Sequence, residues 1–373
     1  MKRTERLYKS LAPLLRPLGC SYSLLMKKRR TRYLTGKSEQ YRACRPTISV
    51  GNIAWGGSGK TPLTAWLLEW AGQSGLHAAV LSRGYGASPG GTPLLVAADT
   101  PPGEAGDEPL LLAQAHPEAS IVVFPKRAQS AQYAEGALSP DIFILDDGMQ
   151  HLAVARDCEL VLLRPEDVSG QWNRVIPGGS WREDASALCA ATAFLMKISP
   201  EELEALKPRI VERLAPFGLP FFSFSMKVRR LAPLTEHAAK IDPPTLVARP
   251  YMVVSGVGNP DQVERTAAEF MRIFSFRSMA FPDHHAYTEK DVDKMLAEAT
   301  RDSQPMPILC TEKDAVKLRP LASLFGRHPV FVLETGLQFG PSLFTEEPFS
   351  VWWERWWQTN SRTFSGSMFP RQA

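Results

Sequence analysis

Cysteine is scarce in this 373-residue sequence, which has five cysteines and no C-x-x-C pair among them. Closely spaced cysteine pairs are typical of structural zinc sites, and secreted disulfide-rich domains contain far more cysteine. The scarcity argues against both classes and favours a protein of a reducing, cytosolic compartment. The five thiols belong to Cys20, Cys44, Cys158, Cys189 and Cys310.

A long hydrophobic run is absent as well, because no window of about 18–20 residues is uniformly apolar. The nearest candidate, residues 7–26, contains Lys9 and Arg16 and is interrupted by Pro13 and Pro17. No small-residue cleavage site follows it, so the stretch is not typical of a signal peptide. The sequence therefore does not predict an ordinary transmembrane helix.

Positive charge is concentrated at the N-terminal end. Residues 1–45 have a net charge of +11, whereas the remaining residues have a net charge of −7. Four basic residues, 27–30, directly follow the apolar stretch, a pattern typical of a helix that lies on an anionic membrane surface. The alternatives are a solvated arm and an arm that binds RNA. Because the arm lacks the interleaved aromatic residues of a nucleic-acid platform, we expect a membrane surface and no nucleic acid.

Strand patterns alternate with helical patterns from residue 47 to residue 196, which predicts a parallel sheet with helices on both faces. An alternating run near residues 221–228 predicts an extended connector, and a second, shorter strand–helix series follows it. The expected segments are an N-terminal arm at 1–45, a larger α/β domain at 46–220, a connector with a smaller α/β domain at 221–350, and a tryptophan-rich tail at 351–373.

The stretch S-V-G-N-I-A-W-G-G-S-G-K-T at 49–61 ends like a phosphate-binding loop. It departs from the strict pattern G-x-x-x-x-G-K-[ST], because Ala54 stands where the first glycine belongs. The alternative is an ordinary glycine-rich turn before a helix. In a phosphate loop the amides approach oxyanions, the lysine bridges phosphates and the hydroxyl reaches Mg²⁺. The predicted nucleotide-binding residues are Gly56, Gly57, Ser58, Gly59, Lys60 and Thr61.

Two carboxylates, Asp146 and Asp147, follow four apolar residues at 142–145. An acid at the carboxyl end of a neighbouring parallel strand lies where the Mg²⁺ of a bound nucleotide must be. The alternative is that an aspartate here caps the next helix. Because the glycine loop and the acids occur in the expected order, the sequence predicts a magnesium–nucleotide site.

Two shorter motifs are candidates for the acceptor side of a reaction. G-D-E-P at 106–109 places adjacent acids before a helix, where they complement the helix dipole or serve an acceptor hydroxyl. F-P-D-H-H at 281–285 contains a histidine that could share a proton with a carboxylate, although adjacent loop histidines are also common on surfaces.

Two other classes of protein remain as alternatives. A P-loop GTPase or metal-insertion chaperone reads guanine with [NT]-K-x-D, and the nearest stretch, T-E-K-D at 311–314, has glutamate where lysine is needed. A non-enzymatic module whose basic arm binds nucleic acid would show steep salt dependence.

Seven stretches together resemble the tetraacyldisaccharide 4'-kinase family, the lipid A 4'-kinases of Gram-negative bacteria. The family's own loop also lacks glycine at the position of Ala54. The stretches are S-V-G-N-I-A-W-G-G-S-G-K-T-P (49–62), L-S-R-G-Y-G (81–86), G-D-E-P (106–109), L-D-D-G-M-Q-H (145–151), W-R-E (181–183), F-P-D-H-H-A-Y (281–287) and T-E-K-D-A-V-K-L (311–318).

The resemblance implies an α/β fold of the P-loop kinase type, with two α/β/α domains joined by a β-ribbon and a basic N-terminal membrane-associating helix. It implies that ATP, with Mg²⁺, phosphorylates the 4'-hydroxyl of the lipid A precursor tetraacyldisaccharide 1-phosphate to give lipid IVA. The reaction is expected at the cytoplasmic face of the inner membrane, with peripheral attachment or a single N-terminal anchor.

The resemblance also implies roles for individual residues. Asp107 matches the family's catalytic carboxylate, and His284 matches its partner histidine. The expected metal group is Thr61, Glu108, Asp146 and Asp147. The residues expected to contact substrate or line the site are Arg83, Tyr85, Gln150, His151, Arg182 and Glu183.

The C-terminal stretch V-W-W-E-R-W-W-Q at 351–358 carries four tryptophans at helical spacing. Such a cluster either forms a belt at a membrane interface or packs on the protein core. The sequence alone leaves both interpretations open.

Overall fold

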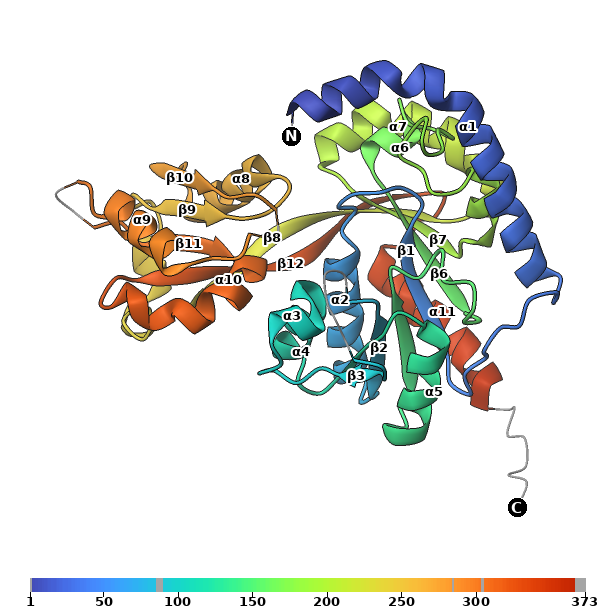
Figure 1. Cartoon of the computed structure of the whole chain (residues 1–373), viewed down its shortest axis with the longest axis horizontal. Helices are drawn as coiled ribbons and strands as arrows, with labels where there is room; N and C mark the ends of the chain where they lie inside the picture. The colour runs from blue at the N-terminus through green and yellow to red at the C-terminus, as the bar shows by residue number, and fades with distance from the viewer. Residues whose placement is uncertain (1, 85–89, 284, 303–304, 366–373) are drawn as a thin grey trace.

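The computed structural model describes residues 2–84, 90–283, 285–302 and 305–365, with side chains from residue 15 to residue 360. Two predicted site residues, Tyr85 and His284, lie outside the described residues. Figure 1 shows two α/β units connected by a long twisted ribbon. Within the described residues, twelve strands form one sheet in the order β10-β9-β11-β12-β8-β7-β6-β1-β5-β2-β4-β3.

The first unit contains six parallel strands, and a short antiparallel strand closes its edge. The strand residues are almost all buried. This agrees with their continuous apolar runs, which predict a sheet covered on both faces. The strands are β1 (Thr47–Asn52), β2 (Ala78–Ser82), β4 (Ser120–Val123), β5 (Ile142–Asp146), β6 (Cys158–Leu163) and β7 (Ala193–Lys197), with β3 (Leu94–Leu95) at the edge.

Helices cover both faces of this part of the sheet. One hydrophobic core joins the sheet to α2, α4 and the C-terminal helix, and two further clusters join the opposite face to α5, α7 and a 3-10 turn. The helices are α2 (Lys60–Gln73), α3 (Pro102–Ala105), α4 (Asp107–Ala115), α5 (Arg127–Ala137), α6 (Pro165–Val168) and α7 (Pro200–Leu214), with 3-10 turns at Ala185–Ala190 and Ala215–Phe217.

The second unit repeats the three-layer arrangement on a smaller scale. Helices α9 and α10 pack on one face of its sheet, and α8 packs on the other. Its elements are β9 (Met252–Ser255), α8 (Pro260–Met271), β10 (Arg277–Ala280), α9 (Glu289–Ala299), β11 (Ile308–Thr311) and α10 (Glu312–Leu318), with 3-10 turns at Ala238–Lys240, Pro243–Leu246 and Arg319–Phe325.

A two-stranded antiparallel ribbon connects the units. It consists of β8 (Phe221–Pro233) and β12 (Val330–Leu343), whose register runs from Phe331 opposite Pro233 to Leu343 opposite Phe221. One end of β8 pairs with β7 and one end of β12 pairs with β11, so the ribbon belongs to both units. The predicted fold class, two α/β/α units joined by a β-ribbon, is confirmed.

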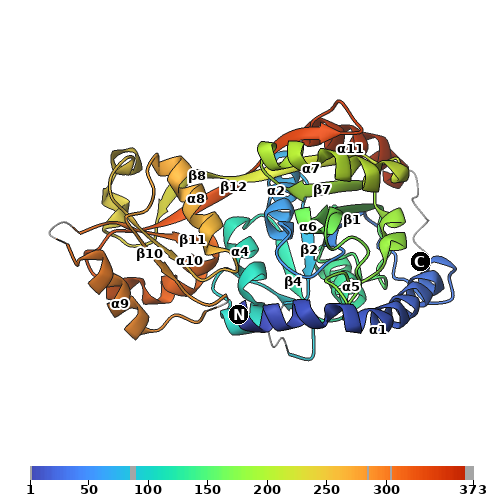
Figure 2. The same cartoon turned by 90° about the horizontal axis from the view of Figure 1, so that it is seen from above.

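The N-terminal arm is a single helix, α1 (Lys2–Leu34), that lies along the first unit (Figure 2). Arg30 forms a buried ion pair with Glu183, at 2.7 and 2.8 Å, and also donates to the carbonyl of Met149 at 3.1 Å. Arg29 donates to the carbonyl of Gln150 at 3.1 Å. None of the helices in the described part of the chain is apolar over a length that would cross a bilayer.

The tryptophan-rich stretch forms α11 (Phe349–Ser365), which packs against α2. Trp353 is fully buried, and its ring lies 5.2 Å from that of Trp70 in an edge-to-face contact. Trp357 packs against the same ring at 5.0 Å, and Trp352 is buried as well. The structure therefore favours core packing over a membrane belt for this stretch.

Candidate active site

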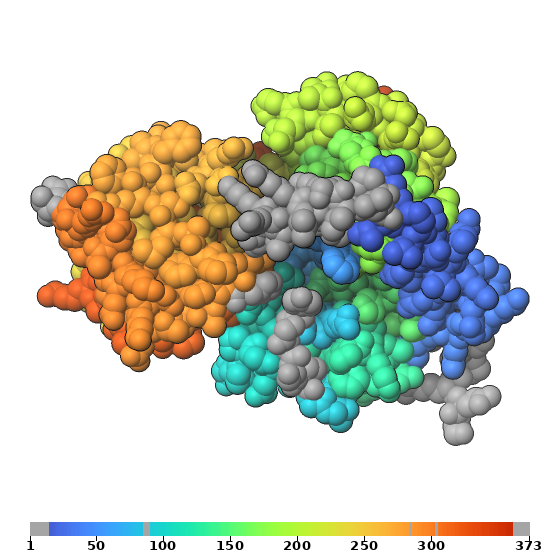
Figure 3. Space-filling view, turned by 45° about the horizontal axis from the view of Figure 1, so that its top comes forward, coloured from blue at the N-terminus to red at the C-terminus, as the bar shows by residue number. Residues whose placement is uncertain are grey.

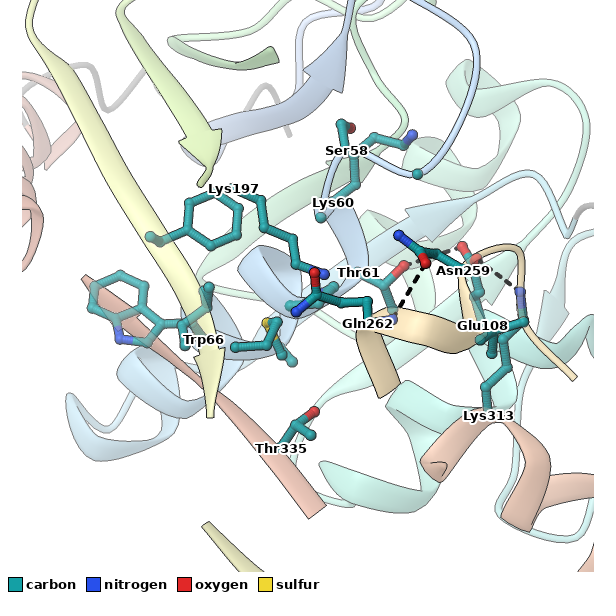
Figure 4. Close-up of a pocket in the computed structure, with 18 of the residues that line it drawn as sticks. Ser58, Lys60, Thr61, Trp66, Glu108, Lys197, Asn259, Gln262, Lys313 and Thr335 are labelled. Carbon is teal, nitrogen blue, oxygen red and sulfur yellow. Dashed lines mark hydrogen bonds and ion pairs between the residues drawn. The ribbon is translucent and has the colours of Figure 1, made fainter. Parts of the chain in front are cut away.

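A cleft of about 2740 Å³ lies between the two units and is lined by residues of both. Figure 3 shows the second unit, in orange, beside the first. The first unit contributes the glycine loop and the starts of α2 and α4, and the second contributes α8 and the start of α10. In Figure 4, Thr61 and Glu108 lie across from Gln262 and Lys313.

The glycine loop connects β1 to α2 and adopts a left-handed backbone at two positions. Gly56 has a φ of 109° and Gly59 a φ of 93°, a region in which only glycine is unstrained. A Cβ added at Gly59 would lie 2.8 Å from the ring of Phe224. The loop therefore presents its amides at the N-terminus of α2, as an anion site requires. The predicted loop residues Gly56, Gly57, Ser58, Gly59, Lys60 and Thr61 all line the cleft.

Ala54 lies outside the working part of this loop. It is fully buried and forms an antiparallel β-bridge with Trp181. The next residue, Trp55, donates its amide to the carbonyl of Ser180 at 3.0 Å. Because position 54 is extended and paired, its backbone needs no left-handed conformation and hence no glycine.

Lys60 and Arg182 converge on Asp147. The Lys60 Nζ lies 3.5 Å from Asp147 Oδ1, and Arg182 Nη1 donates to both carboxylate oxygens at 3.0 and 3.2 Å. Burial favours the protonated form of Asp147, but Lys60 and Arg182 outweigh it and hold its pKa below the usual value. Asp147 therefore orients two cations in the floor of the cleft, and its predicted role as a metal ligand stays a prediction.

Asp146 ends β5 and is buried. Its Oδ2 accepts a hydrogen bond from Ser82 Oγ at 3.1 Å, and its Oδ1 has no hydrogen-bond partner among the described residues. Burial, together with the negative charges of Glu108 and Asp147, raises its pKa to about 6. Such a carboxylate is stabilised by any cation that enters the site.

The oxygen atoms suited to binding Mg²⁺ belong to Thr61 and to the nearby carboxylates of Glu108 and Asp146. Its Oγ1 donates to Glu108 Oε2 at 3.1 Å, and the unsatisfied oxygen of Asp146 is buried beside the same cleft. In the described residues no three histidine, cysteine, aspartate or glutamate side chains form a complete metal site. Mg²⁺ in phosphoryl-transfer sites commonly uses one or two carboxylates, with water and phosphate as its other ligands. These residues therefore fit a nucleotide-bound magnesium rather than a protein cage.

Asp107 is the first residue of α4 and follows Gly106, which has a φ of 85°. Its Oδ2 accepts a hydrogen bond from Lys317 Nζ of the second unit at 3.2 Å. The loop that precedes His284 approaches the same place, because Asp283 lies 3.5 Å from Lys313 Nζ. The Asp107–His284 pair itself stays a prediction, since His284 is not among the described residues.

The remaining predicted residues divide into two groups. Arg83, Gln150, His151 and Arg182 line the cleft. Burial and the neighbouring arginines lower the pKa of His151 to about 3, so its ring is neutral at physiological pH. Glu183 does not line the cleft but pairs with Arg30 behind it. Its contact fixes α1, and its predicted role at the substrate site stays a prediction.

Several cleft residues were missed by the sequence interpretation. Arg127 begins α5, donates to the carbonyl of Asp146 at 3.3 Å, and has a pKa lowered to about 10 by burial. Lys197 ends β7 and extends toward Gln262 of α8 (Figure 4). Both basic residues follow or end an apolar strand, so the rule that identified Asp146 also applies to them. Nothing in the local sequence indicated that Lys317 reaches Asp107.

A glycine loop at a helix N-terminus, a lysine and a threonine directed at it, and a buried carboxylate on the adjacent strand define a P-loop nucleotide-binding protein. A family model described as tetraacyldisaccharide-1-P 4'-kinase matches residues 11–347, and the chain belongs to this family. It is accordingly a lipid kinase. The GTPase alternative is not favoured, and Asp314 of the T-E-K-D stretch is fully buried at the start of α10.

Known proteins of the same description align over almost the full length. The tetraacyldisaccharide 4'-kinase of Nitratidesulfovibrio vulgaris is 46% identical over 357 residues, which cover 96% of this chain and 97% of that protein. The enzyme of Pseudomonas entomophila is 36% identical over 313 residues, covering 83% and 84%. The crystal structure of LpxK from Aquifex aeolicus in complex with ATP is similar with a TM-score of 0.70 and 27% identity, covering 95% and 99%.

Proposed function

We propose that this chain transfers the γ-phosphoryl group of ATP to the 4'-hydroxyl of tetraacyldisaccharide 1-phosphate, giving lipid IVA. The observation that carries the proposal is that Lys60 and Asp107, from different elements of the first unit, line one cleft. The Lys60 ammonium is suited to binding phosphate, and the Asp107 carboxylate is suited to binding an acceptor hydroxyl. A kinase reaction needs both the phosphate donor and the acceptor in one place.

The glycine loop binds the triphosphate in this proposal. Amides at Gly57 to Thr61 point at anionic oxygens at the helix N-terminus, and Lys60 neutralises charge that spreads over the transferred group. Asp147 and Asn52 hold the Lys60 amine at 3.5 and 3.3 Å, so it is positioned before the nucleotide arrives. Preorganised charge of this kind lowers the barrier without further rearrangement.

Thr61, Glu108 and Asp146 would hold the Mg²⁺ that accompanies ATP, and Asp147 is a further predicted ligand. When bound, the ion supplies charge neutralisation at the phosphates. Burial, and after it the negative charges of Glu108 and Asp147, raise the pKa of Asp146 to about 6, and a bound divalent cation would offset both effects.

Asp107 is the proposed group that orients the acceptor hydroxyl and receives its proton, and His284 is its proposed partner. A carboxylate in this role must lie within hydrogen-bond reach of the hydroxyl and keep a fixed orientation. Its place at the first turn of α4, and its contact with Lys317, provide that orientation.

We also propose that α1 attaches the protein peripherally to the anionic, cytoplasmic face of the inner membrane. Leu24 and Leu25 are 68% and 66% exposed on its outer side. Lys27 and Lys28 are exposed beside them, which suits a helix in the interfacial region. Arg30 cannot share this role, because it is buried against Glu183. A nucleic-acid partner is not part of the proposal.

The segment boundaries after residues 45, 220 and 350 stay predictions. Limited proteolysis, with mass spectrometry of the early fragments, tests whether the chain is cut first at those places. Protection of the chain around residue 350, with no early cut there, would contradict a separate tail and would agree with the packing of Trp353 on Trp70.

The direct test is a radiolabelled ATP assay with purified tetraacyldisaccharide 1-phosphate in mixed micelles. Wild-type protein is expected to label the lipid at the 4' position. Lys60→Ala and Asp107→Ala should each lower the rate by roughly 10²–10⁴-fold, the range for loss of positioned proton transfer or charge stabilisation. Lipid labelling by either variant at a near wild-type rate would remove that residue from the mechanism.

A further inference from the structure

We propose that Lys317 is a positioning residue of the transfer reaction: from α10 of the second unit it contacts Asp107 of the first unit and fixes the orientation of that carboxylate. The inference rests on the proposed role of Asp107. It also assigns a function to the stretch T-E-K-D-A-V-K-L at 311–318, most of which forms α10.

The contact between Lys317 and Asp107 is close and largely excluded from water. Lys317 Nζ donates to Asp107 Oδ2 at 3.2 Å, and the two side chains are 9% and 13% exposed. Exposed ion pairs are weak because solvent screens them, whereas a shielded pair with one defined geometry restricts both partners. The pair therefore limits the rotation of the carboxylate that faces the acceptor.

One helical turn away, Lys313 makes a parallel contact. Its Nζ lies 3.8 Å from Glu108 Oε1 and 3.5 Å from Asp283 Oδ1. Residues four apart lie on the same face of a helix. Thus one face of α10 presents two ammonium groups to two adjacent carboxylates of α4. Two such contacts fix the position of one helix along the other, whereas a single contact would leave it free to shift.

The helix that carries Lys317 is itself held firmly. Asp314 is fully buried, and its oxygens accept hydrogen bonds from the amide of Gly256 at 3.0 Å, Tyr287 Oη at 2.9 Å and Thr311 Oγ1 at 2.6 Å. Thr311 in turn accepts from the amide of Asp314 at 3.2 Å, which caps the helix. These four bonds fix the start of α10 to the second unit, so Lys317 has a rigid base.

Tyr287 links the same helix to the loop at 281–287. The Lys317 ammonium lies 6.0 Å from the centre of the Tyr287 ring, whose hydroxyl bonds to Asp314. Phe281 and His285 pack on that ring at 5.1 and 5.0 Å. Helix α10 thus contacts both Asp107 and the segment next to the predicted partner histidine, through Asp283 and Tyr287.

Catalysis depends steeply on such placement, because a displacement of about 1 Å can lower a rate by about 10²-fold. Loss of the Lys317 ammonium is therefore expected to lower kcat about 10- to 100-fold. Affinity for ATP should change less than about twofold, because the glycine loop and Lys60 do not contact Lys317. A residue that merely stabilised the fold would lower both together.

The experiment compares Lys317→Met, which keeps the chain length without charge, with Lys317→Arg, which keeps the charge, in full-length protein. Lys290→Met, at an exposed position of α9, is the matched control. Lipid labelling gives kcat and KM, calorimetric titration gives the Kd for ATP, and thermal melting checks folding. We expect the kcat loss in the Met variant, partial recovery in the Arg variant and wild-type values in the control.

Wild-type kcat in a folded Lys317→Met protein would overturn the inference, as would equal losses of kcat and ATP affinity with a lower melting temperature. If the Met variant does not melt cooperatively, Lys317→Gln is measured in its place under the same criteria. Asp107→Ala separates the two proposals. Normal lipid labelling by that variant contradicts the proposed role of Asp107, whereas loss of labelling there with full activity in the Lys317 variants contradicts only the present inference.

Discussion

Arg30 of α1 and Glu183 of the first α/β unit form a two-point ion pair, at 2.7 and 2.8 Å, that is almost completely buried. The pair makes the N-terminal helix part of the folded body, although the basic sequence around it predicted only a helix on an anionic membrane surface. It also gives Glu183, which the sequence places among the site-lining residues, a direct contact with α1.

The first prediction concerns this pair. Arg30→Met leaves the Glu183 carboxylate buried without its partner, and breaking a buried pair costs about 3–5 kcal/mol of unfolding free energy. Urea denaturation followed by tryptophan fluorescence measures the loss. Arg32→Met is the control, because Arg32 is exposed two residues away on the same helix. Equal stability of the two variants would show that the pair contributes nothing.

The second prediction concerns the backbone of the glycine loop. Gly59→Ala should abolish detectable ATP binding, because the φ of 93° strains alanine and its Cβ would lie 2.8 Å from Phe224. Gly57→Ala is the matched control, since a Cβ at that position meets no atom within 4 Å and the φ is not positive. Calorimetric titration with ATP compares them. Comparable weakening in both variants would contradict the special geometry of Gly59.

The third prediction follows from the raised pKa of Asp146. Its native pKa is about 6, above its ordinary value of 3.8, so its charge destabilises the metal-free fold once the pH exceeds that range. Asp146→Asn removes this cost and should raise the unfolding free energy at pH 8 by about 1–3 kcal/mol. The gain should fade as the pH falls from about 6 to 4, where the wild-type carboxyl becomes protonated.

The measurement is thermal or urea unfolding across pH 4–8 in EDTA, with lipid labelling measured separately in Mg²⁺. The same substitution should lower transfer, because it removes a proposed metal ligand. A stability gain that does not depend on pH would point to a packing effect rather than to the charge. Ser82→Ala, which removes only the hydrogen bond to Oδ2, is a useful comparison.

The fourth prediction concerns α11. Trp353→Ala should destabilise the protein by about 3–5 kcal/mol, because the side chain is fully buried against Trp70 and Phe349. Val351→Ala, half exposed on the same helix, should change stability little. Melting temperatures measure both. If Trp353→Ala instead left stability unchanged and reduced vesicle binding, the membrane interpretation of the tryptophans would regain support.

The fifth prediction concerns membrane attachment. Leu24→Gln and Leu25→Gln together should release the protein from vesicles containing phosphatidylglycerol, with roughly a tenfold or greater loss of affinity for each leucine. Leu324→Gln, at an exposed leucine of the second unit, is the control. Flotation gives the bound fraction. Deleting residues 2–32 is a poorer test, because it also removes Arg30 and leaves Glu183 unpaired.

Most strands of the first unit could be predicted well because they are short apolar runs bounded by turns. The run at 142–145 even located Asp146, because an acid at the carboxyl end of a buried parallel strand faces the ligand edge of the sheet. The apolar run at 330–333 predicts only the start of the return strand β12, which continues to Leu343. The second half of β12 is partly exposed and contains Gly336 and Gly340. Neither its apolar content nor its strand propensity therefore predicts a strand there.

Contacts between distant segments were the least predictable. Lys317 and Asp107 are 210 residues apart, and only the ribbon geometry brings them together. The positive charge of Arg30 suggested a lipid headgroup, and only the position of Glu183 in space shows another partner. Charge and spacing indicate what a residue can do, whereas its neighbour depends on the packing of whole elements.

The ribbon has a consequence for how the molecule could be divided. Because β8 leaves the first unit and β12 returns to it side by side, residues 234–329 form an insertion whose two ends are neighbours. Helices α1 and α11 both pack on the host body. Insertions with adjacent ends can be excised without stretching the host. A short hairpin turn between Pro233 and Val330 should therefore leave a host that folds and retains its glycine loop, while the cleft loses its opposite wall.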